Sequence, residues 1–246
     1  MNNHTGQTIL GALISAAFLA LLSLFFSACA GRNASVMEDP VPEAPGHSGN
    51  SMIIVKKSQE VVYNGKPQPI SFSYTGKEAP GIIYYPSSQA RREERRGTTA
   101  APVRAGTYYV RLLGYSDGKN HLLVEEHFVE YRILKCPVKI EAKKTQEAFY
   151  NGDPKRVQAK TDPPVLLSYS YYPNRELRET AQRAAAEIAA QKGSGQIPTD
   201  AYKGYKRVER APTEQGTYYV WVYFPGDENY EAAQVNVEFT IYPPKM

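Results

Sequence analysis

Residues able to do chemistry are few and scattered in this sequence. None of the four histidines has a second metal ligand at a recognisable spacing. No Gly-x-Ser-x-Gly, Walker, His-Glu-x-x-His or Cys-x-x-Cys motif occurs. Asp227, Glu228 and Glu231 offer the oxygen ligands that calcium takes, but their spacing differs from that of a calcium loop, which favours a solvated turn. The sequence therefore predicts no catalytic residue, no metal and no cofactor.

The N-terminal segment has the composition of an export signal. Residues 9–26 carry no charge and consist mostly of Leu, Ala, Ile and Phe, with small residues following them. This pattern is typical of a signal peptide, although a retained membrane anchor of this length is an alternative. Every Lys, Arg, Asp and Glu lies after Cys29, so we expect the rest of the chain to be exported.

The end of this segment, Phe26-Ser27-Ala28-Cys29, resembles a bacterial lipobox. The resemblance implies a signal peptide over residues 1–28 and acylation of Cys29, and two or three acyl chains hold a protein stably on a membrane. Phe26 stands where Leu is usual, and residues 1–8 contain no Lys or Arg. Ordinary cleavage or a retained helix is the alternative.

The other cysteine, Cys136, could then pair only with another molecule, and we predict instead a partly buried thiol between two domains. Residues 29–52 are rich in Pro, Gly and small polar residues, which predicts a flexible tether.

The composition favours β-structure. The 246 residues include 19 Tyr, 18 Gly and 18 Pro, a combination that suits strands and frequent turns. The net charge of +4 is modest and does not indicate a nucleic-acid binder.

One unit occurs twice. Four sequence blocks return in the same order, the first two at an offset of 87 residues and the third at 110, so copy two carries an insertion. The blocks are Gln-Glu-x-x-Tyr-Asn-Gly-x-Pro, Tyr-Tyr-Pro, Ala-Pro-x-x-x-Gly-Thr-Tyr-Tyr-Val and a short hydrophobic strand. Asn-Gly predicts a turn. Internal repeats of this kind indicate tandem domains.

Period-two alternation predicts short strands in both copies. In copy one they are 53–57, 70–74, 82–85, 107–115 and 125–134, and in copy two 138–142, 165–172, 217–224 and 235–242. The insertion, residues 175–192, lacks Gly and Pro and predicts a helix capped by Asn174 and Gly193. Its narrow apolar face is Leu177, Ala181, Ala184 and Ile188. Copy one has only the charged run 91–96 at this place, which predicts a solvated segment rather than a phosphate-binding patch.

The ordered blocks, followed by Gly226-Asp227-Glu228-Asn229-Tyr230, resemble the MBG repeat and its bacterial immunoglobulin-like relatives. That resemblance implies extracytoplasmic scaffolding, adhesion or display, and no catalytic residues. Copy one departs from it by lacking the Asn-Tyr turn, and the helical insertion is atypical.

We therefore expect an all-β protein with two tandem immunoglobulin-like sandwiches, at residues 53–136 and 137–246, joined near residues 135–138. A β-grasp-like sheet packed by a helix is the alternative. Pro137 suits the junction because it has no amide donor.

The function expected is that of a lipid-anchored, non-catalytic binding or structural module of a bacterial cell envelope, periplasmic or surface-exposed. Its partners would be the membrane, through the anchor, and an envelope or host protein or a glycan. The alternative is an enzyme or enzyme inhibitor with an unrecognised site.

Three aromatic residues on one strand form the candidate interaction face. Alternation places Tyr219, Trp221 and Tyr223 opposite the core-facing side chains. Either the inserted helix covers this row, through Leu177 and Ile188, or a partner protein or sugar ring stacks on it.

Overall fold

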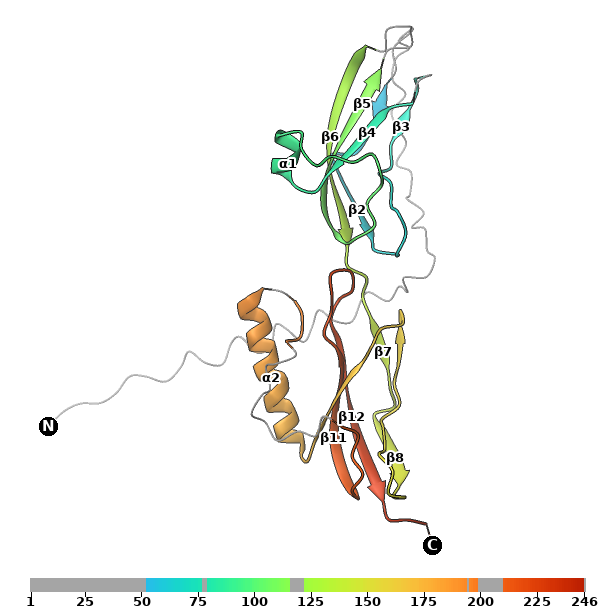
Figure 1. Ribbon diagram of the computed structural model, residues 1–246, viewed down its shortest axis with the longest axis vertical. Helices are drawn as coiled ribbons and strands as arrows, with labels where there is room; N and C mark the ends of the chain where they lie inside the picture. The colour runs from blue at the N-terminus through green and yellow to red at the C-terminus, as the bar shows by residue number, and fades with distance from the viewer. Residues whose placement is uncertain (1–51, 77–78, 116–121, 194, 199–209, 246) are drawn as a thin grey trace, which may run out of the picture.

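The computed structural model describes residues 52–76, 79–115, 122–193, 195–198 and 210–245. Two β domains follow one another end to end along an elongated molecule (Figure 1). We call residues 53–136 domain 1 and the described residues from 137 onward domain 2.

Domain 1 is a two-layer sandwich. Its larger sheet has the order β2-β6-β5-β4, with β2 parallel to β6 and the other neighbours antiparallel, and its smaller sheet pairs β1 with β3. The strands are β1 Ile53–Ile54, β2 Ser58–Val62, β3 Ser73–Tyr74, β4 Gly81–Tyr85, β5 Gly106–Tyr115 and β6 Leu123–Leu134.

Domain 2 repeats this plan. Its larger sheet has the order β10-β11-β12-β8, with β8 parallel to β12, and its smaller sheet pairs β7 with β9. The strands are β7 Lys139–Glu141, β8 Thr145–Phe149, β9 Lys160–Asp162, β10 Ser168–Tyr172, β11 Gly216–Phe224 and β12 Ala233–Tyr242. The fold is all-β and immunoglobulin-like, as expected, and the β-grasp alternative does not describe it.

Each domain encloses its own core, and the two cores are built from equivalent positions. Tyr84, Val110 and Leu112 are buried in domain 1, and Tyr171, Val220 and Val222 are buried at the repeat-matched places in domain 2. On the last strand of each copy the alternate inward residues are equally buried. These are Val129, Tyr131 and Ile133 in domain 1 and Val237, Phe239 and Ile241 in domain 2. Period-two alternation thus gives each large sheet an inner, apolar face.

The repeated Ala-Pro-x-x-x-Gly-Thr-Tyr block closes the same corner in both domains. The hydroxyl of Tyr108 donates to the carbonyl of Arg104 at 2.9 Å, and Tyr218 donates to that of Glu214 at 3.0 Å. A tyrosine that bonds to backbone a few residues upstream is a known corner of immunoglobulin-like sandwiches. The proline carbonyls of this block accept from the amides of Gln68 and Lys155, both at 2.9 Å.

The glutamine of the first block ties the two layers together. Gln146, on β8, donates to the carbonyl of Gln158 at 2.8 Å and accepts from its amide at 2.7 Å. Gln59 makes the same pair of bonds with the backbone of Ser71, at 2.6 and 3.0 Å. The side-chain amide donates to and accepts from the backbone of one residue, as a neighbouring strand would. This explains why Gln recurs at this position.

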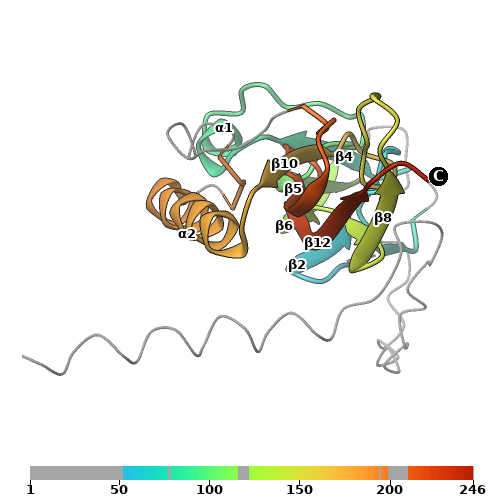
Figure 2. The same cartoon turned by 90° about the horizontal axis from the view of Figure 1, so that it is seen from below.

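A helix follows the Tyr-Tyr-Pro block in both copies. α1 (Ser88–Arg92) begins at Ser87, whose hydroxyl accepts from the Ala90 amide, and α2 (Arg175–Lys192) begins at Asn174 in the same way. Gly193 ends α2 in the left-handed conformation, as predicted. The insertion in copy two therefore lengthens a helix that copy one already has. Figures 1 and 2 show both helices on the same side of the molecule.

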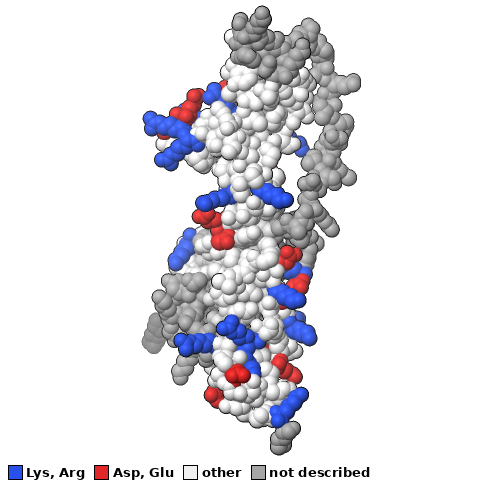
Figure 3. All heavy atoms as spheres, turned by 45° about the vertical axis from the view of Figure 1, so that its right-hand side comes forward, with Lys and Arg blue, Asp and Glu red and all other residues white. Residues whose placement is uncertain are grey.

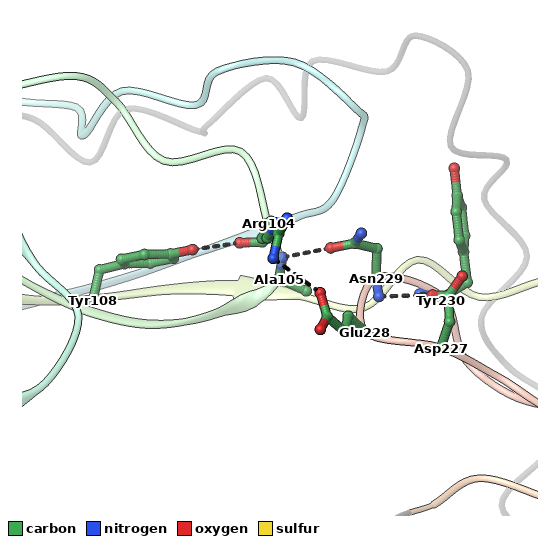
Figure 4. A network of polar contacts seen from close by, with 7 residues as sticks. All are labelled: Arg104, Ala105, Tyr108, Asp227, Glu228, Asn229 and Tyr230. Carbon is green, nitrogen blue, oxygen red and sulfur yellow. Dashed lines mark hydrogen bonds and ion pairs between the residues drawn. The ribbon is translucent and has the colours of Figure 1, made fainter.

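The Gly226–Tyr230 block forms the contact between the domains (Figure 4). The side-chain oxygen of Asn229 accepts from the amide of Ala105 in domain 1 at 3.0 Å. Tyr230 packs edge-on against Tyr63, with ring centroids 5.3 Å apart. Arg104 and Glu228 add an ion pair at 3.3 Å that is largely exposed, so it contributes little.

The loop itself is held in shape by its own residues. The Asp227 carboxylate accepts from the amides of Asn229 and Tyr230, both at 2.8 Å. Gly226 has φ +82°, and a Cβ there would lie 3.0 Å from the Ala232 nitrogen, so only glycine fits without a shift.

Cys136 lies at the same junction and is completely buried, more so than predicted. Its amide donates to the carbonyl of Asn229 at 2.8 Å, and its carbonyl accepts from the amide of Glu231 at 2.9 Å. The linker backbone thus pairs with the domain 2 loop, and the two domains share a continuous set of contacts.

Several predicted boundaries were wrong. The expected strands 53–57 and 70–74 are reduced to two residues each, and three strands were missed: β2, β8 and β9. β2 and β8 were missed because they are edge strands with an exposed–intermediate alternation and no buried residue. The period-two signal depends on a buried face.

We predict that Gln146→Ala lowers the unfolding free energy of domain 2 by about 1–2 kcal/mol, because two inter-layer hydrogen bonds are lost at a partly solvated site. Trp221 is the only tryptophan in the chain, so its fluorescence during urea titration reports this transition. The matched control is Gln158→Ala, which leaves the backbone partners of Gln146 in place and should change little. Equal effects of the two substitutions would contradict the assignment.

At the junction we predict that Asn229→Ala accelerates amide exchange at Ala105 by roughly fivefold or more, since one partly buried acceptor worth about 1 kcal/mol is removed. Hydrogen–deuterium exchange followed by NMR measures this directly. Glu228→Ala removes only the exposed ion pair and serves as the control. Unchanged exchange in Asn229→Ala would show that this bond does not hold the domains together.

Candidate interaction surface

The predicted aromatic row lies on the outer face of the domain 2 sheet and is covered by α2. Trp221 is 1% exposed and Tyr223 is 4% exposed, and both pack with Ala181 and Ala185 of the helix. Tyr219 is half-buried at the end of the row. The geometry matches the interpretation in which the inserted helix covers the row, and the two buried rings do not offer an open binding face.

Direct contacts fix α2 on this sheet. The Trp221 indole nitrogen donates to Gln234 at 2.7 Å, and its ring stacks on Tyr223 with centroids 4.4 Å apart. Gln182 of the helix donates to the side-chain oxygen of Asn236 at 2.8 Å. The guanidinium of Arg175 lies 5.6 Å from the centre of the Tyr219 ring.

The buried face of α2 differs in part from the predicted apolar face. Ala181 and Ala185 are the buried small residues, whereas Ala184 and Ile188 are only partly buried. Leu177 packs at one edge, and Ile197, beyond the helix, closes the other in place of Ile188. The small side chains are needed because the large Trp221 and Tyr172 rings bring the sheet surface close to the helix axis.

Domain 1 presents the matching outer face without such a helix. The strand register aligns the middle row Ile83–Arg111–Phe128 of domain 1 with Ser170–Trp221–Asn236 of domain 2. Arg111 thus takes the place of Trp221, and Phe128 takes the place of Asn236. Among the described residues, the five-residue α1, with one buried residue, Ala90, and the turn at Gly97, which packs on Ile83 and Tyr85, lie over this face.

The result is an exposed apolar strip next to basic side chains. Phe128 is 45% exposed and Val124 43%, and Leu122 and Leu123 beside them are more than half exposed. The guanidinium of Arg91 stacks on Phe128, 4.7 Å from its ring centre, within the range of a cation–π contact. Figure 3 shows basic side chains, with acidic ones among them, on the lobe that projects at the height of α1.

A hollow of about 270 Å³ separates α1 from the sheet. Arg91, Arg92, Glu94, Arg111, Glu126 and Phe128 line it. Arg111 bonds to Glu126 and, at 3.0 Å, to Glu94. The hydrogen bond to Glu126 raises the pKa of Arg111, although partial burial opposes the rise. Both carboxylates are therefore committed to one guanidinium, which leaves Arg91 and Arg92 as the basic groups open to a ligand.

We define the domain 1 outer face by Arg91, Arg92, Val124 and Phe128, together with Tyr109. Sequence reasoning missed it because it looked for aromatic rows, and this face has a single exposed ring. The available signal was a difference between the copies: Phe128 stands at the place of Asn236, and no long helix precedes it.

The remaining predicted sites are placed as follows. Cys29 and residues 29–51 lie outside the described residues. Asp227 and Glu228 make the backbone and ion-pair contacts of the junction. Within the described part of the chain, no three His, Cys, Asp or Glu side chains are grouped as metal ligands. None of the described helices has the length and apolar character to cross a membrane.

Comparisons with known proteins find structural neighbours alone. No family model matches the chain, and no curated protein sequence matches it. Among solved structures, titin domains Z1Z2 in complex with telethonin show 10% identity over 81% of this chain and 100% of that one, with a TM-score of 0.30. Fibronectin(III)-like modules of Clostridium thermocellum CbhA show 13% identity over 78% and 95%, with a TM-score of 0.24.

The N-terminal Ig1-2 module of the Drosophila receptor tyrosine phosphatase DLAR shows 11% identity over 80% of this chain and 100% of that one, with a TM-score of 0.21. These are likenesses of architecture at low identity.

We predict that Trp221→Ala lowers the stability of domain 2 by about 3–5 kcal/mol, because it removes a fully buried ring and leaves a cavity under α2. Scanning calorimetry measures the loss without needing the tryptophan signal. Arg111→Ala, at the equivalent place in domain 1, is the control and should cost about 1 kcal/mol or less. If Trp221→Ala unfolded at an unchanged temperature, α2 would not be covering the sheet as described.

Proposed function

We infer that this protein is a lipid-anchored, non-catalytic binding module of a bacterial cell envelope. The observation that carries the proposal is the open outer face of domain 1, on an immunoglobulin-like pair that follows a lipobox-like sequence. An exposed apolar patch with polar residues at its rim commonly marks an interaction site, and here the rim carries basic groups without an acidic partner in the part of the chain that the structure describes.

Two grooves among the described residues bear on the non-catalytic half of the proposal. The hollow beside α1 contains two carboxylates, but both bond to Arg111, so neither is poised as a free acid or base. The groove along β7, β8 and β9 is lined by lysines, small residues, Gln146 and the carboxylates of Glu141 and Glu147. Glu141 is paired with Lys139, and Glu147 accepts from the hydroxyl of Tyr242, so neither carboxylate is placed as the base of a nucleophile.

The anchoring half rests on Cys29 and the resemblance of residues 26–29 to a lipobox. The tether of residues 29–52 would stand the rod of two domains off the membrane, with the domain 1 outer face and α2 on one side of it. The resemblance of the repeat blocks to MBG repeats fits display in the envelope, as an adhesive or internal scaffolding element.

We predict that Cys29→Ser abolishes metabolic labelling with a palmitate analogue and shifts the protein from the membrane to the soluble fraction. Acylation needs the thiol, and a chain without lipid lacks the apolar anchor. Cys136→Ser is the matched control and should keep both labelling and membrane association.

Non-reducing electrophoresis of the same samples tests the competing use of Cys29. A disulfide between Cys29 and Cys136, together with absent labelling, would refute the anchor. Protease treatment of intact cells then separates the two locations: degradation indicates surface display, and protection indicates a periplasmic scaffold.

A further inference from the structure

The outer faces of the two large sheets differ at the centre of each sheet. In domain 2, Ser170 and Trp221 are buried beneath α2, whereas Asn236 beside them is exposed. In domain 1, Ile83 and Arg111 are half-buried beside α1 and the turn at Gly97, and Phe128 is 45% exposed. We propose that an acidic, amphipathic helix of a partner protein packs on the domain 1 outer face next to α1, over Phe128 and Val124.

The apolar part of this face suits protein side chains. Phe128 and Val124 of β6 are each more than two-fifths exposed, and Leu122, directly before that strand, is 62% exposed. Aliphatic residues make up most of the strip, and the guanidinium of Arg91 already stacks on its exposed ring, Phe128. Non-polar side chains on one stripe of a helix match such a surface.

The charges on the rim select an acidic partner. Arg91, Arg92, Arg95 and Arg96 form no ion pair with any described carboxylate, because Glu94 bonds to Arg111 and Glu93 to Gln89. Arg91 is oriented by its stacking on Phe128, so its guanidinium is fixed beside the apolar strip. Carboxylates of a bound helix would form charge-assisted hydrogen bonds there, and such bonds are stronger than neutral ones.

The segment that carries these arginines is held in a defined conformation. Glu94 has φ 51° and Arg96 has φ 57°, a left-handed geometry that residues other than glycine rarely adopt. The Arg95 amide donates to the carbonyl of Ala90 at 2.9 Å, and the Glu94–Arg111 pair closes the turn against the sheet. Backbone outliers that are stabilised in this way cluster at ligand sites.

This inference refines the proposed binding function, and it is tested in cells that produce the full-length chain. A photoreactive benzoylphenylalanine replaces Phe128, and a second strain carries it at Phe149, which is 44% exposed at the far end of domain 2. After irradiation, the adduct is digested and sequenced by mass spectrometry. We expect position 128, and not position 149, to join to a polypeptide segment rich in Asp and Glu with apolar residues at helical spacing.

Charge variants test the role of the arginines. Arg91→Glu with Arg92→Glu should reduce the adduct by roughly tenfold or more, because it replaces two attractive contacts by repulsion. Lys56→Glu with Lys57→Glu changes the net charge equally near the opposite edge strand β2 and should leave the adduct intact. Equal unfolding temperatures of the two double variants show that folding is not responsible.

Three results would overturn the proposal: an adduct to carbohydrate or lipid, no adduct at position 128, or an adduct that survives the Arg91 and Arg92 reversals. Cys29 labelling in the same strains keeps the two proposals apart. Labelled Cys29 without an adduct defeats the helix partner alone, whereas an adduct on an unlabelled chain defeats the anchor alone.

Discussion

A β-sandwich buries only one face of each sheet. Whether the other face is covered or open decides what this molecule can do. Side chains alternate across a strand, so every inward Val220 or Val110 brings an outward Trp221 or Arg111 with it. In domain 2 the helix at this place is the long α2, and its Ala181 and Ala185 pack on the aromatic rings of the outer face. In domain 1 the helix is short, and the place of Trp221 is taken by Arg111, which is paired with two glutamates. The two copies thus have equivalent cores and differ in the outer face of the larger sheet.

The contacts at the junction hold the outer face of domain 1 in a defined position relative to domain 2. Asn229, Tyr230 and the backbone of Cys136 connect the loop of domain 2 to the base of domain 1, and the Asp227 carboxylate pre-shapes the loop. The exposed ion pair of Arg104 and Glu228 adds little to this attachment. Because the contacts are short-range and directional, both helices remain on one side of the rod (Figure 1). A partner that meets the open face of domain 1 therefore also approaches α2.

The sequence alone predicted what depends on local pattern. The repeat, the inward registers and the helix with its caps at Asn174 and Gly193 follow from spacing and residue type, and they were confirmed. The edge strands β2 and β8 could not be found, because no residue on them is buried. The recurring Gln59 and Gln146 gave no chemical signal either, since their partners are backbone groups twelve residues away. Trp221 was recognised as outward-facing, yet only the structure shows that Ala185 and Ile197, rather than Ile188, complete its cover. The open face of domain 1 could not be predicted, because the sequence does not show which helix covers which sheet.

The central claim is that α2 buries Trp221 and Tyr223 on the outer face of domain 2, whereas Phe128 on the outer face of domain 1 is open. Hydroxyl-radical footprinting of the full-length protein, with side-chain oxidation read by mass spectrometry, tests it in one measurement. The account predicts rapid modification of Phe128 and strong protection of Trp221 and Tyr223, although an indole is intrinsically the most reactive of these rings. Oxidation of Trp221 at the rate of an exposed indole, or protection of Phe128 in the isolated protein, would contradict it.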